Sequence, residues 1–251
     1  MQNFPSDFPG LVSFLSLNMG TDHKWRKAAS RIVFDEGEIS AKLQEEFAKQ
    51  NLKPLFLLKG GPRFIISKKP VRSIADLKGM KIRSTGSYLP KLYSKLGMVP
   101  VTVSTAELYD ALAKGLVDAV AFAPSNIYDF KLHEVAKNMS FMISGSADQV
   151  WSMNLDTWKS LPADIQKVME DLRPDVMEYD NNLENTANAA AREKLEAGGV
   201  QFAAISSADQ NYVLELEKGL LREEWLPAME KQGLGTLGKQ LLDRWFVLAQ
   251  Q

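Results

Sequence analysis

The sequence contains no cysteine and only two histidines in 251 residues. The lack of cysteine excludes disulfide bonds, thiolate nucleophiles and cysteine-ligated metal sites. His23 and His133 each lie within a predicted helix, and neither has a sequence neighbour that would complete a metal-binding pair. We therefore expect surface or packing roles for both histidines, no metal site and no cofactor.

Long apolar runs and an excess of one charge are also absent. No apolar run approaches the roughly 18 residues that span a membrane. The 30 basic and 31 acidic residues leave a net charge of −1, which indicates no nucleic-acid-binding surface. The first residues have neither the basic region nor the apolar segment of an export signal. We expect neither a membrane protein nor a nucleic-acid-binding protein.

Motifs of catalysis are equally scarce. The Gly-Gly-Pro sequence at residues 60–62 lacks the lysine and the spacing of a phosphate-binding loop. Together with the missing cysteine and the unpaired histidines, this argues against an enzyme and predicts no catalytic residues. A hydrolase that uses only carboxylates stays open. The composition, 45% hydrophobic and 24% charged, is typical of a globular protein with a sizeable core.

The most regular pattern runs from Asp76 to Asp118 and alternates short strands with helices. The predicted elements cover residues 81–83, 88–96, 99–103, 104–115 and 116–122. Ser104 and Glu107 have the spacing of a capping box, and Gly115 suits a left-handed helix end. The last strand is almost wholly apolar, as expected when both faces of a sheet are covered. The pattern predicts an α/β fold, in which ligands bind at the carboxyl ends of strands.

The remaining chain continues this alternation. Predicted helices cover residues 22–32, 38–50, 73–78, 130–135, 162–172, 175–197, 206–225 and 236–248. Predicted strands cover residues 53–58, 63–67, 141–144, 149–155 and 200–204. Pro174 is expected to separate two helices, because proline breaks or kinks a helix interior.

Residues of the central segment resemble the core of the DctP-type solute-binding proteins of TRAP (tripartite ATP-independent periplasmic) transporters. The matching residues are Ser73–Arg83 (SIADLKGMKIR), Leu96-Gly97 with Pro100, and Glu107–Leu112 (ELYDAL) with Gly115 and Asp118. The resemblance extends from about Phe4 to about Ile205. It implies a two-lobed, periplasmic-binding-protein-like α/β fold with a cleft between the lobes.

The resemblance also implies how the chain divides. The first lobe would consist of residues 1–60 and 149–188, and the second of residues 61–148 and 189–251. A hinge strand near 149–155 and a long helix over 175–197 would link the two lobes. Family members begin with an export signal and about two βα units that should precede Phe4. We therefore expect the first lobe to be incomplete at its N-terminus and less protected from hydrogen exchange than the second. We also expect the isolated chain to bind its ligand weakly or not at all.

Two arginines at strand ends are the main candidates for ligand binding. In carboxylate-binding members of the family, arginines at the positions of Arg63 and Arg83 hold the substrate carboxylate. A planar guanidinium binds a carboxylate with two parallel hydrogen bonds and stays charged at any working pH. The alternative for either arginine is an ordinary surface or internal ion pair.

Further candidates would shape specificity. Phe122 stands where acid-binding members commonly carry an asparagine, which favours a ligand with an apolar body, and Asn126 could take over from that asparagine. Trp151 and Asn154 on the hinge strand could reach the cleft, and Thr105 completes the candidate substrate-binding set. Phe122 and Trp151 could equally be core residues.

The resemblance implies a periplasmic protein that captures a small organic acid and delivers it to the membrane subunits of a TRAP transporter. The alternative is an effector-binding sensory domain of a regulator with similar lobes. The sequence leaves the ligand open, because a linear dicarboxylate, an aromatic acid and a keto acid all suit an arginine clamp.

Overall fold

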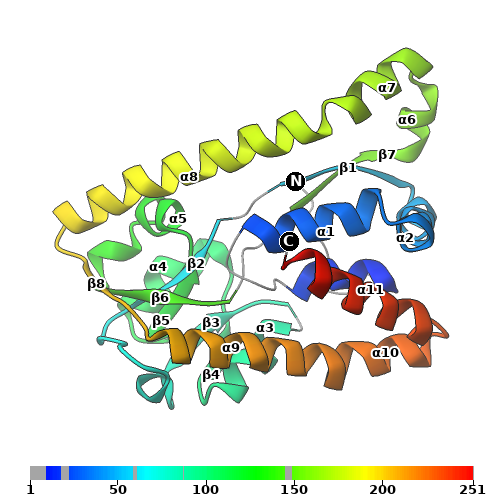
Figure 1. Cartoon of the computed structure of the whole chain (residues 1–251). Coiled ribbons are helices and arrows are strands. Elements are labelled where there is room, and N and C mark those ends of the chain that lie inside the picture. Colours follow the sequence, from blue (N-terminus) through cyan, green and yellow to red (C-terminus); the bar gives the residue numbers. More distant parts are fainter. Residues whose placement is uncertain (1–9, 18–22, 59–60, 87, 145–148, 251) are drawn as a thin grey trace.

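The computed structural model describes residues 10–17, 23–58, 61–86, 88–144 and 149–250. Their strands form a two-stranded sheet, β1-β7, and a six-stranded sheet in the order β4-β3-β5-β2-β6-β8. The two sheets lie in different parts of the molecule (Figure 1). The strands are β1 (Leu52–Leu58), β2 (Arg63–Ser67), β3 (Lys81–Ser84), β4 (Val99–Thr102), β5 (Ala119–Phe122), β6 (Asn138–Ser144), β7 (Gln149–Asn154) and β8 (Gln201–Ala203).

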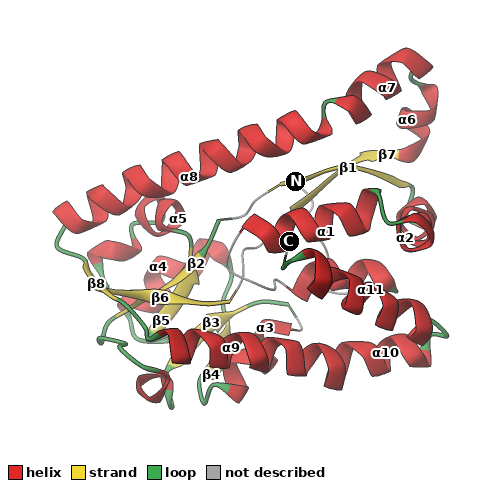
Figure 2. Cartoon of the chain, viewed as in Figure 1, coloured by secondary structure: helices red, strands yellow, loops and turns green. Residues whose placement is uncertain are grey.

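Helices connect and cover these strands (Figure 2). The α-helices are α1 (His23–Phe34), α2 (Gly37–Lys49), α3 (Tyr88–Lys95), α4 (Leu108–Ala113), α5 (Pro124–Asp129), α6 (Leu155–Ser160), α7 (Ala163–Asp171), α8 (Arg173–Ala197), α9 (Ser207–Leu220), α10 (Leu226–Lys231) and α11 (Gly235–Leu248). Four short 3₁₀ helices, η1 (Leu11–Leu17), η2 (Ile74–Leu77), η3 (Thr105–Glu107) and η4 (Leu132–Glu134), and a π-helical turn, η5 (Leu221–Trp225), complete the elements of the described residues.

The large sheet is covered on both faces. Successive residues of a strand point to opposite faces, and the fully buried neighbours Ile65 and Ile66 of β2 belong to different hydrophobic clusters. Ile66 packs in the cluster that contains Leu112 of α4 and Ile127 of α5. Ile65 belongs to the cluster that contains residues of α3 and α9. We call this sheet with α3, α4, α5 and α9 the large-sheet lobe.

The small sheet is built differently. Strand β1 pairs antiparallel with β7, with a register shift between Pro54 and Phe56. Helix α11 packs on α1 beside this sheet, where the Trp245 indole nitrogen donates to the backbone oxygen of Trp25 at 3.1 Å. Helix α11 also reaches the start of α2, where Arg244 Nε lies 2.6 Å from Glu36 Oε2. We call β1, β7, α1, α2 and α11 the small-sheet lobe.

Helix α8 contacts both lobes. Its 25 residues give a length of about 37 Å at 1.5 Å per residue, and Figure 1 shows it along one side of the molecule. Near its start, Arg173 Nε donates to the backbone oxygen of Leu55 in β1 at 2.9 Å. Near its end, Leu195 is fully buried in the cluster of the large sheet. The fold is therefore two-lobed, and one rigid helix joins the lobes.

Most elements agree with the sequence-based expectations. The predicted long helix over 175–197 is α8, and Pro174 lies in its first turn. Gly97 and Gly115 both have positive φ, +80° and +75°, as left-handed helix ends require. The helix expected from Ser206 is α9, and the Ser206 side chain accepts from the Asp209 backbone nitrogen.

Other expectations were wrong. The strand expected over 116–122 begins only at Ala119, and Leu116 is 55% exposed. Ser104 forms no capping box, because its hydroxyl donates directly to the Glu107 carboxylate at 2.5 Å. Of the helix expected over 130–135, only the short 3₁₀ helix η4 is present. The α-helix of this region is α5, which precedes η4 and begins at Pro124. Proline is favoured in the first turn of a helix.

The expected lobe boundaries place residues 189–251 wholly in the second lobe. The packing of α11 on α1 favours placing α11 with the small sheet instead. The exact division between the lobes therefore stays a prediction.

Candidate ligand-binding site

Arg83 is a buried cation with a fixed orientation. It lies near the carboxyl end of β3, beside Val101 of β4, and is only 9% exposed. Its Nε donates to the backbone oxygen of Val103 at 3.1 Å, and a terminal nitrogen donates to Thr105 Oγ1 at 3.4 Å. Burial lowers the pKa of Arg83, although a guanidinium remains charged near neutral pH. The strand and η3 thus hold the guanidinium in place.

Arg63 adds a second positive charge near the first. It begins β2 opposite Ser144 of β6, and its charge contributes, after burial, to the lowered pKa of Arg83. Within the described ranges, no salt bridge joins Arg83 to a carboxylate. An anion bound at Arg83 would relieve the repulsion between the two cations.

Phe122 lies next to Arg83, and Phe130 lies next to Phe122. The guanidinium carbon of Arg83 lies 5.3 Å from the centroid of the half-buried Phe122 ring, within cation–π range. The Phe122 ring lies 5.7 Å from the ring of Phe130, which follows α5. The structure therefore brings Arg83, Thr105 and Phe122 together, as the sequence led us to expect, and adds Phe130.

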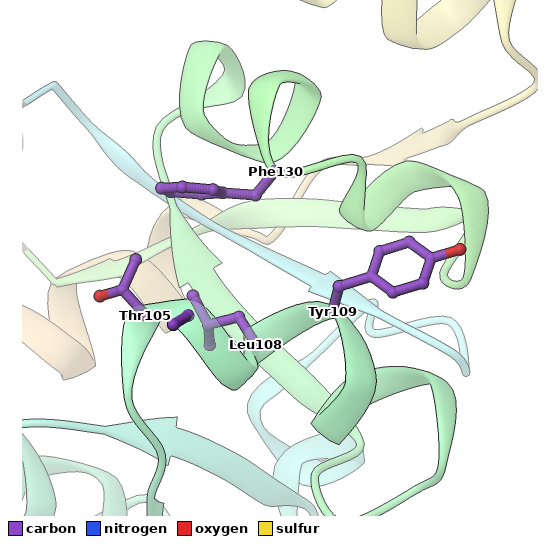
Figure 3. Close-up of a pocket in the computed structure, with 5 residues that line it drawn as sticks. Thr105, Leu108, Tyr109 and Phe130 are labelled. Carbon is purple, nitrogen blue, oxygen red and sulfur yellow. The ribbon is translucent and has the colours of Figure 1, made fainter.

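A cavity of about 480 Å³ adjoins this group. It is lined by Thr105, Ala106, Leu108, Tyr109 and Phe130, and its volume is within the usual range for small-molecule sites. Figure 3 shows the Phe130 ring across from Thr105 and Leu108, with the Tyr109 hydroxyl directed away from them. That hydroxyl donates to Glu134 at 3.1 Å.

Sequence reasoning missed the three larger lining residues. Leu108 lies on the apolar face of the helix predicted over 104–115 and is a core residue, only 1% exposed, that also lines the cavity. Phe130 begins the helix expected over 130–135, of which the structure retains only η4, and it lies instead at the end of α5. No spacing signal in the sequence connects Phe130 with Thr105, because only the tertiary fold brings α5 and η3 together.

The other candidates lie elsewhere. Trp151 of β7 is 45% exposed and pairs with Phe56 in the small sheet. Asn154 caps α6, because its side-chain oxygen accepts from the backbone nitrogens of Asp156 and Thr157, both at 3.0 Å. Asn126 lies half-buried on α5. The described contacts bring none of these three to Arg83.

The described residues also bear on other kinds of site. They contain no group of three or more metal-ligating side chains that could hold an ion. None of their helices has the length and apolarity needed to cross a bilayer. The His133 ring stacks on Tyr128 with centroids 5.1 Å apart, which is a packing contact.

Comparison with known proteins identifies the class of protein. A solved TRAP periplasmic solute binding protein from Desulfovibrio salexigens, with bound orotic acid, superposes with a TM-score of 0.80 at 25% identity. The match covers 98% of this chain and 77% of that one. The fold is thus that of the two-lobed binding proteins of TRAP transporters.

Sequence relatives place the chain more closely. The sequence profile of the DctP family, bacterial extracellular solute-binding protein family 7, matches residues 25–237. The chain belongs to this family. A C4-dicarboxylate-binding periplasmic protein DctP of Rhodobacter capsulatus is 25% identical over 70% of this chain and 53% of its own length.

A solute-binding protein of Sulfitobacter sp. strain NAS-14.1 is 27% identical over 72% of this chain and 55% of its own length. The chain therefore spans about half the length of the curated relatives that it matches.

Proposed function

We propose that the chain is the ligand-binding part of a periplasmic solute-binding protein, which captures a small organic acid and delivers it to the membrane subunits of a TRAP transporter. The observation that carries the proposal is the buried, oriented guanidinium of Arg83, whose described hydrogen bonds use two of its five N–H groups. The remaining donors suit the two oxygens of a carboxylate.

The relatives support an acid as the ligand. The Rhodobacter capsulatus relative is named for C4-dicarboxylates, and the Desulfovibrio salexigens structure contains orotic acid. Both compounds carry a carboxylate that an arginine can bind. A further relative from Vibrio cholerae, 32% identical over 47% of this chain, is named for sialic acid, which is also a carboxylate.

Delivery to a transporter requires that the ligand-bound and ligand-free proteins differ in conformation. A ligand held on the large-sheet lobe would stabilise the conformation in which the small-sheet lobe also contacts it, and hinge closure would follow from that difference in affinity. Arg63 is proposed as the second cation that attracts the carboxylate. We propose binding without turnover, and no observation favours the alternative of a regulator's sensory domain.

Calorimetry tests the role of Arg83. Succinate, benzoate and pyruvate serve as probes of the three acid classes, with Arg83→Lys compared with the parent chain and with Arg72→Lys, an exposed control. An ammonium cannot form the paired hydrogen bonds, so Arg83→Lys should weaken the best-bound acid about 10- to 100-fold. Arg72→Lys should leave the affinity unchanged. Unchanged affinity in a folded Arg83→Lys protein would contradict the proposal.

A further inference from the structure

The cavity beside Arg83 has properties that select among acids. We propose that the hollow formed by Thr105, Leu108, Tyr109 and Phe130 receives the body of the ligand and selects a flat aromatic ring over a polyhydroxylated sugar acid. This inference rests on the proposed function, because it assumes that the carboxylate of the same ligand is bound by Arg83.

The position of the hollow fits such a ligand. Thr105 lines the cavity and also accepts a hydrogen bond from Arg83 at 3.4 Å. Phe130 lines the cavity and also packs against Phe122, over which Arg83 lies. A ligand whose carboxylate binds Arg83 can therefore extend past Thr105 and Phe122 into the cavity.

The lining offers few partners for hydroxyl groups. The Thr105 hydroxyl accepts from Arg83 and keeps one O–H to donate, whereas the Tyr109 hydroxyl is engaged with Glu134 and points away from Phe130 (Figure 3). Ala106 and Leu108 have no polar side-chain atoms. A sugar acid would find few side-chain replacements here for its hydrogen bonds to water, and each hydroxyl that is buried unpaired is costly.

The aromatic side chains favour a ring in its place. Aromatic pairs gain from offset or edge-to-face contact beyond the area that they bury. Phe130 is 37% exposed, so part of its ring surface is available to a ligand. Trp151, the other aromatic residue expected to shape specificity, lies on the small sheet, which leaves Phe130 as the ring that selects the ligand.

Calorimetry with benzoate and glucuronate tests this selection in the parent chain, Phe130→Ala and Tyr212→Ala. Tyr212 is an exposed aromatic residue of α9 and serves as the matched control. We expect benzoate to bind at least tenfold more tightly than glucuronate to the parent chain. Phe130→Ala should weaken benzoate about tenfold and change glucuronate by less than about threefold, a selective loss of the size expected for one aromatic contact with its burial.

The outcomes separate this inference from the proposed function. Tighter binding of glucuronate than of benzoate would overturn the inference, as would an unchanged affinity for benzoate in Phe130→Ala. In either case the loss of acid binding in Arg83→Lys would still support the proposed function. If neither acid binds the folded parent chain, and succinate and pyruvate also fail, both proposals are wrong.

Discussion

The two lobes differ in how they support their strands. In the large-sheet lobe, β2 lies between β5 and β6, and its residues Ile65 and Ile66 are fully buried on opposite faces. In the small-sheet lobe, β1 and β7 pair with each other, and Trp151 of β7 is 45% exposed. A cation that must bind an anion in one geometry needs a rigid support. Arg83, the proposed anion-binding residue, lies on the better supported of the two sheets.

The comparison predicts that core truncation costs more in the large-sheet lobe. Ile66 of β2 and Leu57 of β1 are both fully buried. Ile66→Ala should lower the free energy of unfolding by about 4 kcal/mol, and Leu57→Ala by about 2 kcal/mol, because a site with strands on both sides collapses less around a cavity. Urea denaturation of both variants measures the difference. Equal or reversed values would contradict the comparison.

Hydrogen exchange examines the same contrast without a mutation. Backbone amides of β2 and β5 should exchange only through global unfolding, whereas those of β1 and β7 should exchange through local opening. We expect exchange at least about 100-fold faster in the small sheet, which corresponds to about 2.8 kcal/mol. Uniform protection of both sheets would show that the small sheet is as well supported as the large one.

Removing the contact between α8 and α5 should lower the free energy of unfolding by a smaller amount. Asn188 of α8 is buried, and its side-chain oxygen accepts from the Ser125 backbone nitrogen at the start of α5 at 3.1 Å. Gly61 lies so close to this residue that an added Cβ would meet Asn188 Nδ2 at 3.2 Å. Asn188→Ala leaves the backbone N–H of Ser125 without this acceptor and should cost about 1–2 kcal/mol.

Chemical denaturation measures that cost, with Asn182→Ala as control. Asn182 lies exposed on the same helix, so the control reproduces the change in helix propensity. If the two substitutions have the same effect, α8 is not held to α5 through Asn188.

The smallest expected change in stability concerns Asp76, in the turn that precedes β3. Asp76 accepts from the backbone nitrogens of Arg72 and Ser73, and these hydrogen bonds lower its pKa in the folded state. A lowered pKa stabilises the fold above the ordinary pKa of aspartate, and this contribution is lost as the pH falls through the folded-state value. Asp76→Asn should therefore lower the Tm slightly at pH 7 and make it less sensitive to acid. Thermal denaturation from pH 7 to pH 2 would contradict this if the two curves stayed parallel.

Local signals allowed much of the fold to be predicted from the sequence. The turn at residues 73–78 carries a capping box between Ser73 and Asp76, and Gly97 and Gly115 end helices in the conformation that favours glycine. Such features depend on neighbours in the sequence. The sequence also placed Arg83 at a strand end, where the structure holds it.

Other features of the structure could not be predicted from the sequence. The hydroxyl of Ser104 bonds to the Glu107 side chain rather than to the backbone, and no spacing distinguishes these outcomes. Phe130 lies at the end of α5, a helix that was not among the expected elements. Asn154 looked available for a ligand, but the start of α6 occupies its side chain.

The most direct test of the account is a crystal structure of the chain with benzoate. The account predicts that the carboxylate lies about 2.7–2.9 Å from the terminal nitrogens of Arg83, with the ring against Phe130. Arg83 should keep its hydrogen bond to Val103 in that complex. A benzoate bound away from Arg83, with the guanidinium still touching only Val103, Thr105 and Phe122, would contradict the central claim that the large-sheet lobe holds the ligand carboxylate.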